Sequence, residues 1–148
     1  MMQAFTKNPE MKRDFLFDFA TMPARERYKL MLSTIVPRPI AWIVTLDLEG
    51  QPNAAPFSFF NAFATDPPVV GIGMGSHDPG RPKDTRRNIL DSGEFVVNLV
   101  SEDMTEAMNI SAIPFEPGIN ELSVARVETR PSVYIKPPRI DRPCKTLH

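Results

Sequence analysis

The hydrophobic pattern is densest between Pro37 and Phe63, where it predicts two strands joined by a tight turn. From Pro39 to Leu46 apolar side chains fill both alternating faces and only Thr45 is polar, which is typical of a strand buried on both sides. Asp47-Leu48-Glu49-Gly50 follows, with a hydrogen-bond acceptor at its start and a glycine where a positive φ is easiest. We therefore expect a hairpin connection here.

The return strand, Gln51 to Ser58, carries two prolines, which cannot donate backbone hydrogen bonds. We expect this strand at a sheet edge, or with its free positions facing something other than a strand, such as a ligand. Ser58-Phe59-Phe60-Asn61 comes next, and its hydroxyl, two flat rings and amide are able to hold a planar heterocycle by its polar edge. Aromatic residues in strands are more often core than ligand contacts, so Phe57, Phe59 and Phe63 alone do not decide between the two.

The rest of the pattern predicts further strands and short helices. Helices are expected from about Thr21 to before Pro37, at residues 83–90 and, capped by Ser101, at residues 102–110. Strands are expected at residues 69–74, 94–100 and 124–129, with an extension at 131–135. The alternating Phe15, Phe17 and Phe19 indicate a short extended segment packed on the rest of the domain. Because strands predominate, a mainly antiparallel barrel or sandwich fits better than alternating βαβ units.

Three glycines, Gly71, Gly73 and Gly75, follow an apolar run in the manner of a dinucleotide-binding loop. However, Ser76 stands where the third glycine of that fingerprint belongs, and the segment His77–Pro82 cannot open the helix that a phosphate would need. Glycine in a strand more often marks the close approach of a backbone or a ligand, and we adopt that interpretation.

Composition narrows the choice of function. With 148 residues, 42% of them hydrophobic, and a net charge of −1, the chain has the size of one folded domain and no basic surplus for binding nucleic acid. Cys144 is the only cysteine and His77 and His148 are the only histidines, which excludes a disulfide framework and a Cys/His zinc cluster. No apolar run of 18 residues and no export signal are present, so we expect a cytoplasmic protein.

A second cluster with chemical potential lies at the expected helix start Lys83-Asp84-Thr85. Free backbone N–H groups, a hydroxyl and an ammonium group converge there, which suits a phosphate monoester. The alternative is that Asp84 itself caps the helix and occupies those donors.

The segment from Pro114 to Leu122 is a loop by composition. A loop of this length either covers a site or is an ordinary surface connection, and the residues do not decide which.

Several motifs in one order carry a family resemblance: PRPIAW, DLEGQPNAAPFSFFNAF, DPPVV, KDTRRNI, EFVVNLVSEDMTEAMN and KPPRI. Over about residues 21 to 140 the chain resembles the flavin reductase-like family of FMN-binding split barrels. The resemblance implies one domain over residues 1–148, with an N-terminal extension of about 20 residues, folded as a six-stranded antiparallel Greek-key split barrel with short helices. It also implies a homodimer with FMN near the subunit interface.

The resemblance assigns roles to residues of this chain. Trp42, Val44 and Thr45 would flank the flavin, Ser58, Phe60 and Asn61 would meet the ring or its ribityl chain, and Lys83, Asp84 and Thr85 would bind the phosphate. Family members usually continue with further strands after KPPRI, so we expect Ile140 to His148 to be a fragment of the next strand or a shortened ending. The barrel would then be incomplete there and FMN would be held less tightly.

Three functions remain open. The first is an NAD(P)H-dependent flavin oxidoreductase, in which FMN performs the chemistry and no side chain needs to act as an acid or base. The second is an FMN-binding electron-transfer protein without nicotinamide activity, and the third is a fold without tight flavin. His77 is the one candidate for acid–base work, although a solvent-exposed histidine is the simpler interpretation.

Overall fold

The computed structural model describes residues 15–75, 82–116, 119–141 and 145–147, and it divides the chain into two units, Met1–Pro37 and Arg38–His148. In the first unit the predicted helix is confirmed as α1 (Ala24–Thr34), none of whose side chains is buried. Residues 15–18 form no strand, and Phe15 is 85% exposed, so the expected packing of these aromatic residues is not observed within that unit. Among the described residues, no helix is both long and apolar enough to cross a bilayer.

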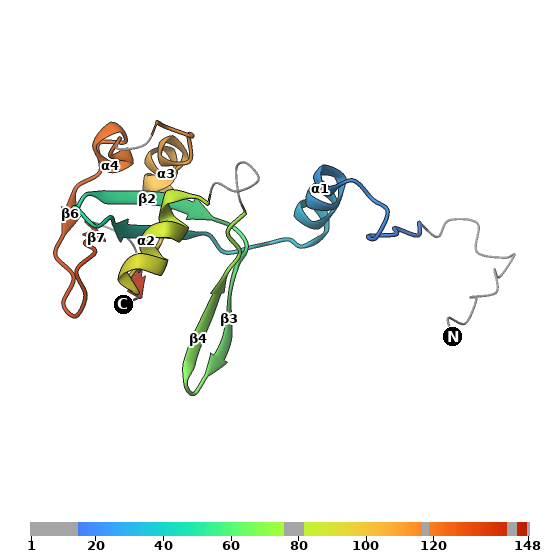
Figure 1. Ribbon diagram of the computed structural model, residues 1–148, viewed down its shortest axis with the longest axis horizontal. Helices are drawn as coiled ribbons and strands as arrows, with labels where there is room; N and C mark the ends of the chain where they lie inside the picture. Colours follow the sequence, from blue (N-terminus) through green and yellow to red (C-terminus); the bar gives the residue numbers. More distant parts are fainter. Residues whose placement is uncertain (1–14, 76–81, 117–118, 142–144, 148) are drawn as a thin grey trace, which may run out of the picture. The chain divides into compact units, whose positions relative to one another are not determined.

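The second unit is built on a four-stranded antiparallel sheet in the order β2-β1-β5-β8 (Figure 1). Its strands are β1 (Ala41–Leu46), β2 (Pro52–Phe57), β5 (Val96–Leu99) and β8 (Lys145–Leu147). Residues 41–45 of β1 have at most 1% exposure, which confirms the prediction of a strand buried on both faces. The predicted turn is also confirmed, because the Asp47 carboxylate accepts from the backbone N–H groups of Glu49 and Gln51, and Gly50 has a φ of 81°.

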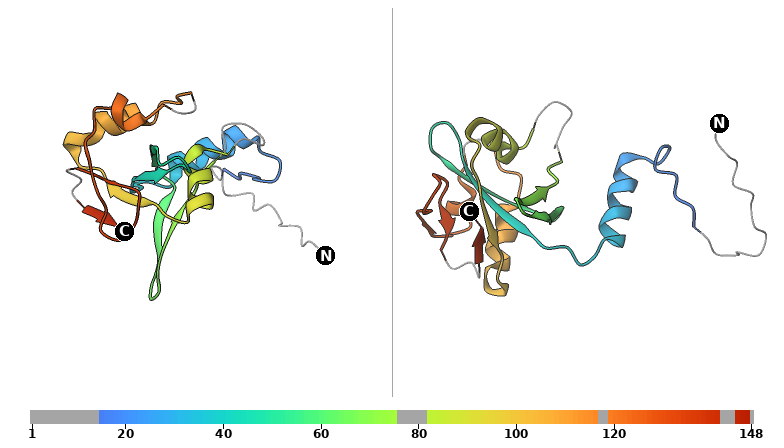
Figure 2. Two further views of the ribbon diagram at one scale, coloured as in Figure 1. Left: turned by 60° about the vertical axis from the view of Figure 1, so that its left-hand side comes forward. Right: turned by 90° about the horizontal axis from the view of Figure 1, so that it is seen from below.

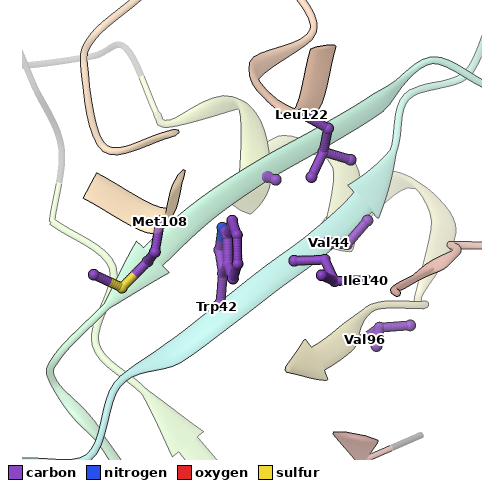
Figure 3. Packing of buried hydrophobic residues seen from close by; sticks show 7 residues of the cluster. Trp42, Val44, Val96, Met108, Leu122 and Ile140 are labelled. Atoms are coloured by element: carbon purple, nitrogen blue, oxygen red, sulfur yellow. The ribbon is translucent and has the colours of Figure 1, made fainter. Parts of the chain in front are cut away.

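Each face of this sheet has its own hydrophobic cluster. On one face Ala41 and Ile43 pack with Ile89 of α2 (Asp84–Ser92). On the other face Trp42, Val44 and Val96 pack with residues of three later elements, as Figure 3 shows. Those elements are α3 (Thr105–Ser111), which contributes Met108, α4 (Glu121–Val124), which contributes Leu122, and β7 (Arg139–Ile140), which contributes Ile140. Alternate side chains of β1 and β5 therefore belong to the two hydrophobic clusters on opposite faces of the sheet, as the sequence pattern predicted.

Two buried polar side chains connect the elements of the second face. The Trp42 indole N–H donates to the Ser111 hydroxyl over 2.9 Å. The fully buried Asn98 amide donates to the Trp42 carbonyl, and its oxygen accepts from the backbone N–H of Ile140, each over 3.0 Å. Because buried polar groups are costly without partners, these bonds fix the positions of α3 and β7 against the sheet.

A separate hairpin of β3 (Phe60–Thr65) and β4 (Pro68–Ile72) extends away from the sheet (Figures 1 and 2). The second strand was predicted and the first was not. A Cβ at Gly71 would overlap the Phe63 ring, and one at Gly73 would lie 2.8 Å from the Phe59 Cβ. The close-approach interpretation of these two glycines is therefore confirmed.

The described residues do not form the expected six-stranded barrel as one sheet. Their eight strands make sheets of four, two and two, the last from β6 (Thr129–Arg130) and β7, so the fold is mainly β with helices and without closure. Part of the physical reason why the sheet does not close lies at β2. This strand pairs with β1 on one side and with no other described strand on its outer side. Pro52 and Pro56 have no N–H group to offer another strand, as predicted for an edge.

Three local predictions need correction. The strand expected at 124–129 is replaced by the end of α4 and by β6, because the Asn120 side chain accepts from the N–H groups of Leu122 and Ser123 and starts a helix. No strand forms at 131–135. The helix expected at 102–110 begins as the 3₁₀ turn η1 (Glu102–Met104), and the Ser101 hydroxyl does not cap it.

The Trp42 contacts lead to a stability prediction. Trp42→Phe removes both the hydrogen bond to Ser111 and ring volume from the core, so we expect a loss of about 2–4 kcal/mol in the free energy of unfolding. Denaturant titration followed by circular dichroism measures it. The control Leu48→Ala, at a side chain that is 78% exposed, should change stability by less than about 0.5 kcal/mol. Equal effects of the two variants would contradict this account of the core.

Candidate functional site

A pocket of about 350 Å³ lies at the edge of the four-stranded sheet. Its walls come from β2, from the start of α2, from the chain that follows α3, and from the first residue of α4. The lining residues are Asn53, Ala55, Pro56, Pro82, Lys83, Asp84, Thr85, Ser111, Ala112, Ile113, Pro114, Phe115, Glu116 and Glu121. The loop that begins at Pro114 was expected either to cover a site or to be an ordinary surface connection. Its first three residues line this pocket, which favours the first alternative.

The edge of β2 is closed to another strand in an unusual way. The Ala54 N–H group donates to Oε2 of Glu121 over 3.2 Å instead of to β1. Pro52 and Pro56 lie two residues to either side, so by the alternation of an antiparallel strand they occupy the same outward positions and have no hydrogen to donate. Of the three outward positions, only Ala54 has an N–H group to donate, and the Glu121 carboxylate accepts it.

The start of α2 leaves its backbone donors without a side-chain cap. Lys83 is the N-cap and makes no capping hydrogen bond, and Asp84 is the first helical residue. The Asp84 carboxylate pairs instead with Arg87, at 2.9 Å. The capping alternative for Asp84 is therefore not observed, and the positive end of the helix dipole faces the pocket.

Lys83 connects this helix start to the end of β2. Its ammonium group lies 5.2 Å from the centroid of the Phe57 ring, within range of a cation–π interaction. Phe57 is the last residue of β2 and Ser58 follows it directly, so the predicted phosphate cluster and the predicted ring cluster are neighbours along this strand end.

A chain of hydrogen bonds runs behind the pocket wall. The Asn53 amide nitrogen donates to Oε1 of Glu121 over 2.6 Å, and its oxygen accepts from the Thr85 hydroxyl over 2.8 Å. Thr45 also approaches the Asn53 oxygen, at 3.5 Å, and accepts from Asn88 at 3.1 Å. Since Thr45, Thr85 and Asn88 have at most 2% exposure, this network is a fixed part of the wall.

Glu121 is the titratable group of this network. Burial raises the pKa of its carboxyl above the ordinary value of 4.5, and the neighbouring Asp84 carboxylate adds to the rise. Hydrogen bonds from its own backbone, from Ala54 and from Asn53 act in the opposite direction, because they stabilise the ionised form.

The structure places the nine predicted site residues in three groups. Lys83, Asp84 and Thr85 line the pocket. Trp42, Val44 and Thr45 are buried in the wall and core behind it, with at most 1% exposure. Ser58 and Phe60 are half-buried at the base of the β3–β4 hairpin, and Asn61 is exposed, its oxygen accepting from the Ala62 N–H group; none of these three lines the pocket. His77 lies outside the described residues.

Sequence reasoning missed Asn53 and Glu121. The one available signal for Asn53 was its place as a polar residue on a strand that Pro52 and Pro56 mark as an edge. Glu121 gives no such signal, because it meets Asn53 only through the packing of α4. In the described part of the chain, no three His, Cys, Asp or Glu side chains gather in a way that could hold a metal ion.

Comparison with known proteins gives relatives for this arrangement. An uncharacterized protein of Aquifex aeolicus is 46% identical over 113 residues, which are 76% of this chain and 58% of that protein. Nitrilotriacetate monooxygenase component B from Bacillus cereus superposes with a TM-score of 0.81 at 31% identity, over 86% of this chain and 63% of that one. The 2-nitrobenzoate 2-nitroreductase NbaA of Pseudomonas fluorescens gives 0.78 at 33% identity, over 89% and 62%.

The fold comparison extends to a Shewanella frigidimarina structure with a split barrel domain. It has a TM-score of 0.71 at 18% identity, over 84% of this chain and 60% of that one, and it shows the likeness of the fold alone. The chain spans somewhat more than half the length of the curated relatives it matches. The model of the flavin reductase like domain matches residues 32–144. The resemblance inferred from the sequence motifs is thus confirmed, and the chain belongs to the flavin reductase-like domain family.

Proposed function

We propose that this protein binds FMN at the β2 edge and catalyses NAD(P)H-dependent reduction of the flavin. The observation that carries the proposal is the pocket in which Lys83 and the uncapped start of α2 meet the end of β2. Bound FMN would accept the hydride, and the chain's own residues would hold and orient it. Two solved relatives above 30% identity are a monooxygenase component and a nitroreductase, which supports an oxidoreductase.

The phosphate half of the proposed site is the start of α2. Backbone N–H groups in the first turn and the Lys83 ammonium group favour an anion there, and the positive end of the dipole of this nine-residue helix acts in the same direction. Asp84 is neutralised in part by Arg87, which reduces its repulsion of a phosphate. Thr85 lines the same wall with its hydroxyl directed to Asn53.

The ring half of the proposed site begins where β2 ends. Pro56 lines the pocket, and Ser58, Phe60 and Asn61 follow within five residues, so a ligand anchored at Lys83 extends along this strand end toward them. The buried side chains of Trp42 and Val44 would support the wall of such a site from behind. Thr45 acts on the pocket through its contact with Asn53.

A second copy of the chain completes this proposal. The β3–β4 hairpin exposes Phe63 at 74%, Val69 at 45% and Val70 at 37%, and exposed apolar side chains favour association. A homodimer formed over the hairpin would place a partner subunit beside Ser58–Asn61, which lies at the hairpin's base.

The phosphate assignment is tested by comparing two ligands. Lys83→Ala should weaken FMN binding about tenfold, or about 1.4 kcal/mol, while the affinity for riboflavin, which lacks the phosphate, stays nearly unchanged. Fluorescence quenching of each flavin measures both dissociation constants. The matched control is Arg86→Ala, which removes a charge from the exposed side of the same helix turn.

The ring half provides the complementary control. Asn61→Ala should lower the affinity for FMN and riboflavin by similar factors, because the ring and ribityl chain are common to both. If Lys83→Ala also lowers both affinities equally, the phosphate does not lie at α2.

The reaction itself is tested with the two nicotinamide donors. With FMN added, the protein should oxidise NADH or NADPH at a rate well above that of free flavin, followed by the absorbance of the reduced nicotinamide. Reduction of bound flavin by dithionite but by neither donor would overturn the reductase and indicate the electron-transfer protein instead.

The dimer is tested by light scattering, which should give twice the chain mass of 16.7 kDa. Val69→Glu places a charge on the exposed hairpin and should reduce the mass to that of one chain. Leu48→Glu, a matched change at an exposed turn residue, should leave the mass unchanged. A dimer that survives Val69→Glu would exclude the hairpin as its interface.

A further inference from the structure

A carboxylate is an unexpected part of a phosphate pocket, and Glu121 lines the pocket opposite the start of α2. We propose that Glu121 is a positioning residue that takes up a proton when a phosphate monoester binds. The protonated carboxyl makes the Asn53 side-chain amide flip, so that its oxygen and nitrogen exchange places. The Thr85 hydroxyl is then released from the Asn53 oxygen and donates to the phosphate. This inference rests on the proposed function, because the phosphate monoester is that of FMN at the same pocket.

In the observed arrangement Glu121 accepts two hydrogen bonds. Its Oε1 accepts from the Asn53 amide nitrogen and its Oε2 from the Ala54 N–H group. The Asn53 amide is thereby oriented with its oxygen toward Thr85, whose hydroxyl spends its only hydrogen on that oxygen. Thr85 lines the pocket but, in this state, has no hydrogen left for a ligand.

Protonation of Oε1 reverses the direction of the bonds that link Glu121, Asn53 and Thr85, and Thr45 gives up its long 3.5 Å contact with the Asn53 oxygen. The new O–H group donates, so the Asn53 amide must present its oxygen to Glu121 and its nitrogen to Thr85. The Thr85 hydroxyl then accepts from that nitrogen and directs its own hydrogen into the pocket, while Oε2 still accepts from Ala54. One proton enters from solvent, one O–H bond forms and no other covalent bond changes.

The charges around Glu121 favour this proton uptake. Among the described residues that line the same space, α2 (Asp84), the β1–β2 turn (Asp47) and the loop after α3 (Glu116) contribute carboxylates. The cations of this set are Lys83, the N-cap of α2, and Arg87 within α2. Together with Glu121 itself, the carboxylates outnumber the cations within this set of pocket-lining residues. A bound phosphate adds negative charge to the same space, which raises the cost of keeping Glu121 ionised.

The titration of the Glu121 carboxyl can first be measured in the unliganded protein, through the pH dependence of its stability. Burial raises the pKa of Glu121 in the folded chain, so its protonated form stabilises the fold. That contribution is fully present below the unfolded pKa near 4.5 and is lost as the pH rises through the higher folded pKa. Glu121→Gln cannot titrate. The melting temperature of wild type relative to this variant should therefore fall over that pH range.

The decisive experiment counts protons on binding. Isothermal titration calorimetry of FMN and riboflavin, in two buffers of different ionisation enthalpy, gives the protons taken up per ligand. We expect wild type to take up more protons with FMN than Glu121→Gln does, by up to one per site, and the two to agree with riboflavin. The titration of the FMN phosphate itself is common to both proteins and cancels. The matched control Glu102→Gln, at an exposed carboxylate that does not line the pocket, should behave as wild type.

Thr85 variants test the released hydroxyl and keep the inference testable if Glu121→Gln does not fold. Thr85→Val, which keeps the shape, should lose the excess of FMN over riboflavin affinity at low pH, and Thr85→Ser should retain it. Equal proton counts in wild type and Glu121→Gln, or an unchanged preference in Thr85→Val, would overturn the inference alone. A wild type that binds FMN no tighter than riboflavin would instead overturn the phosphate site on which it rests.

Discussion

The contact between the Glu121 carboxylate and the Ala54 N–H group is the constraint on which the candidate site depends. An edge strand with free donors invites another strand, and a strand added to β2 would fill the space that is now a pocket. Two prolines remove the outward donors on either side, and the carboxylate takes the one between them. The same bond holds the start of α4 against β2, so it both keeps the edge open and builds a wall of the pocket.

The two faces of the sheet meet at this edge. Asn53 lies on the face covered by α2 and contacts Thr85, whereas Ala54 belongs to the cluster beneath α3 and α4. Because Glu121 bonds to both residues, a displacement of α4 is transmitted to the start of α2 through one amide. The core on the second face keeps α3 in place through the bond from Trp42 to Ser111, and Ser111 lines the pocket as well.

The elements that were predicted correctly are those whose pattern is local. The alternation of β1 and β5, the turn at Asp47–Gly50 and the start of α2 follow from neighbouring residues, and so do the prolines that mark β2 as an edge. The predictions fail where a distant contact or a single helix cap determines the local structure. Asn120 turns an expected loop end into α4, and Glu121 then reaches a residue 68 positions earlier in the chain. No spacing in the sequence reports a contact of that kind.

If the start of α2 binds a phosphate as proposed, the carboxylate of Glu121 beside it has a physical consequence of its own. A cradle of cations and helix N–H groups alone binds any small anion, because Coulomb attraction does not distinguish among them. Ionised Glu121, which holds the Asn53 amide, repels any anion through space. Under the proposal it relieves that repulsion only by accepting a proton and reorienting Asn53. An anion gains from this change only if it is anchored well enough to use the Thr85 hydroxyl as well. A ligand whose ring is already held near the end of β2 would meet that condition, so the proposed switch would favour a tethered phosphate over a free one.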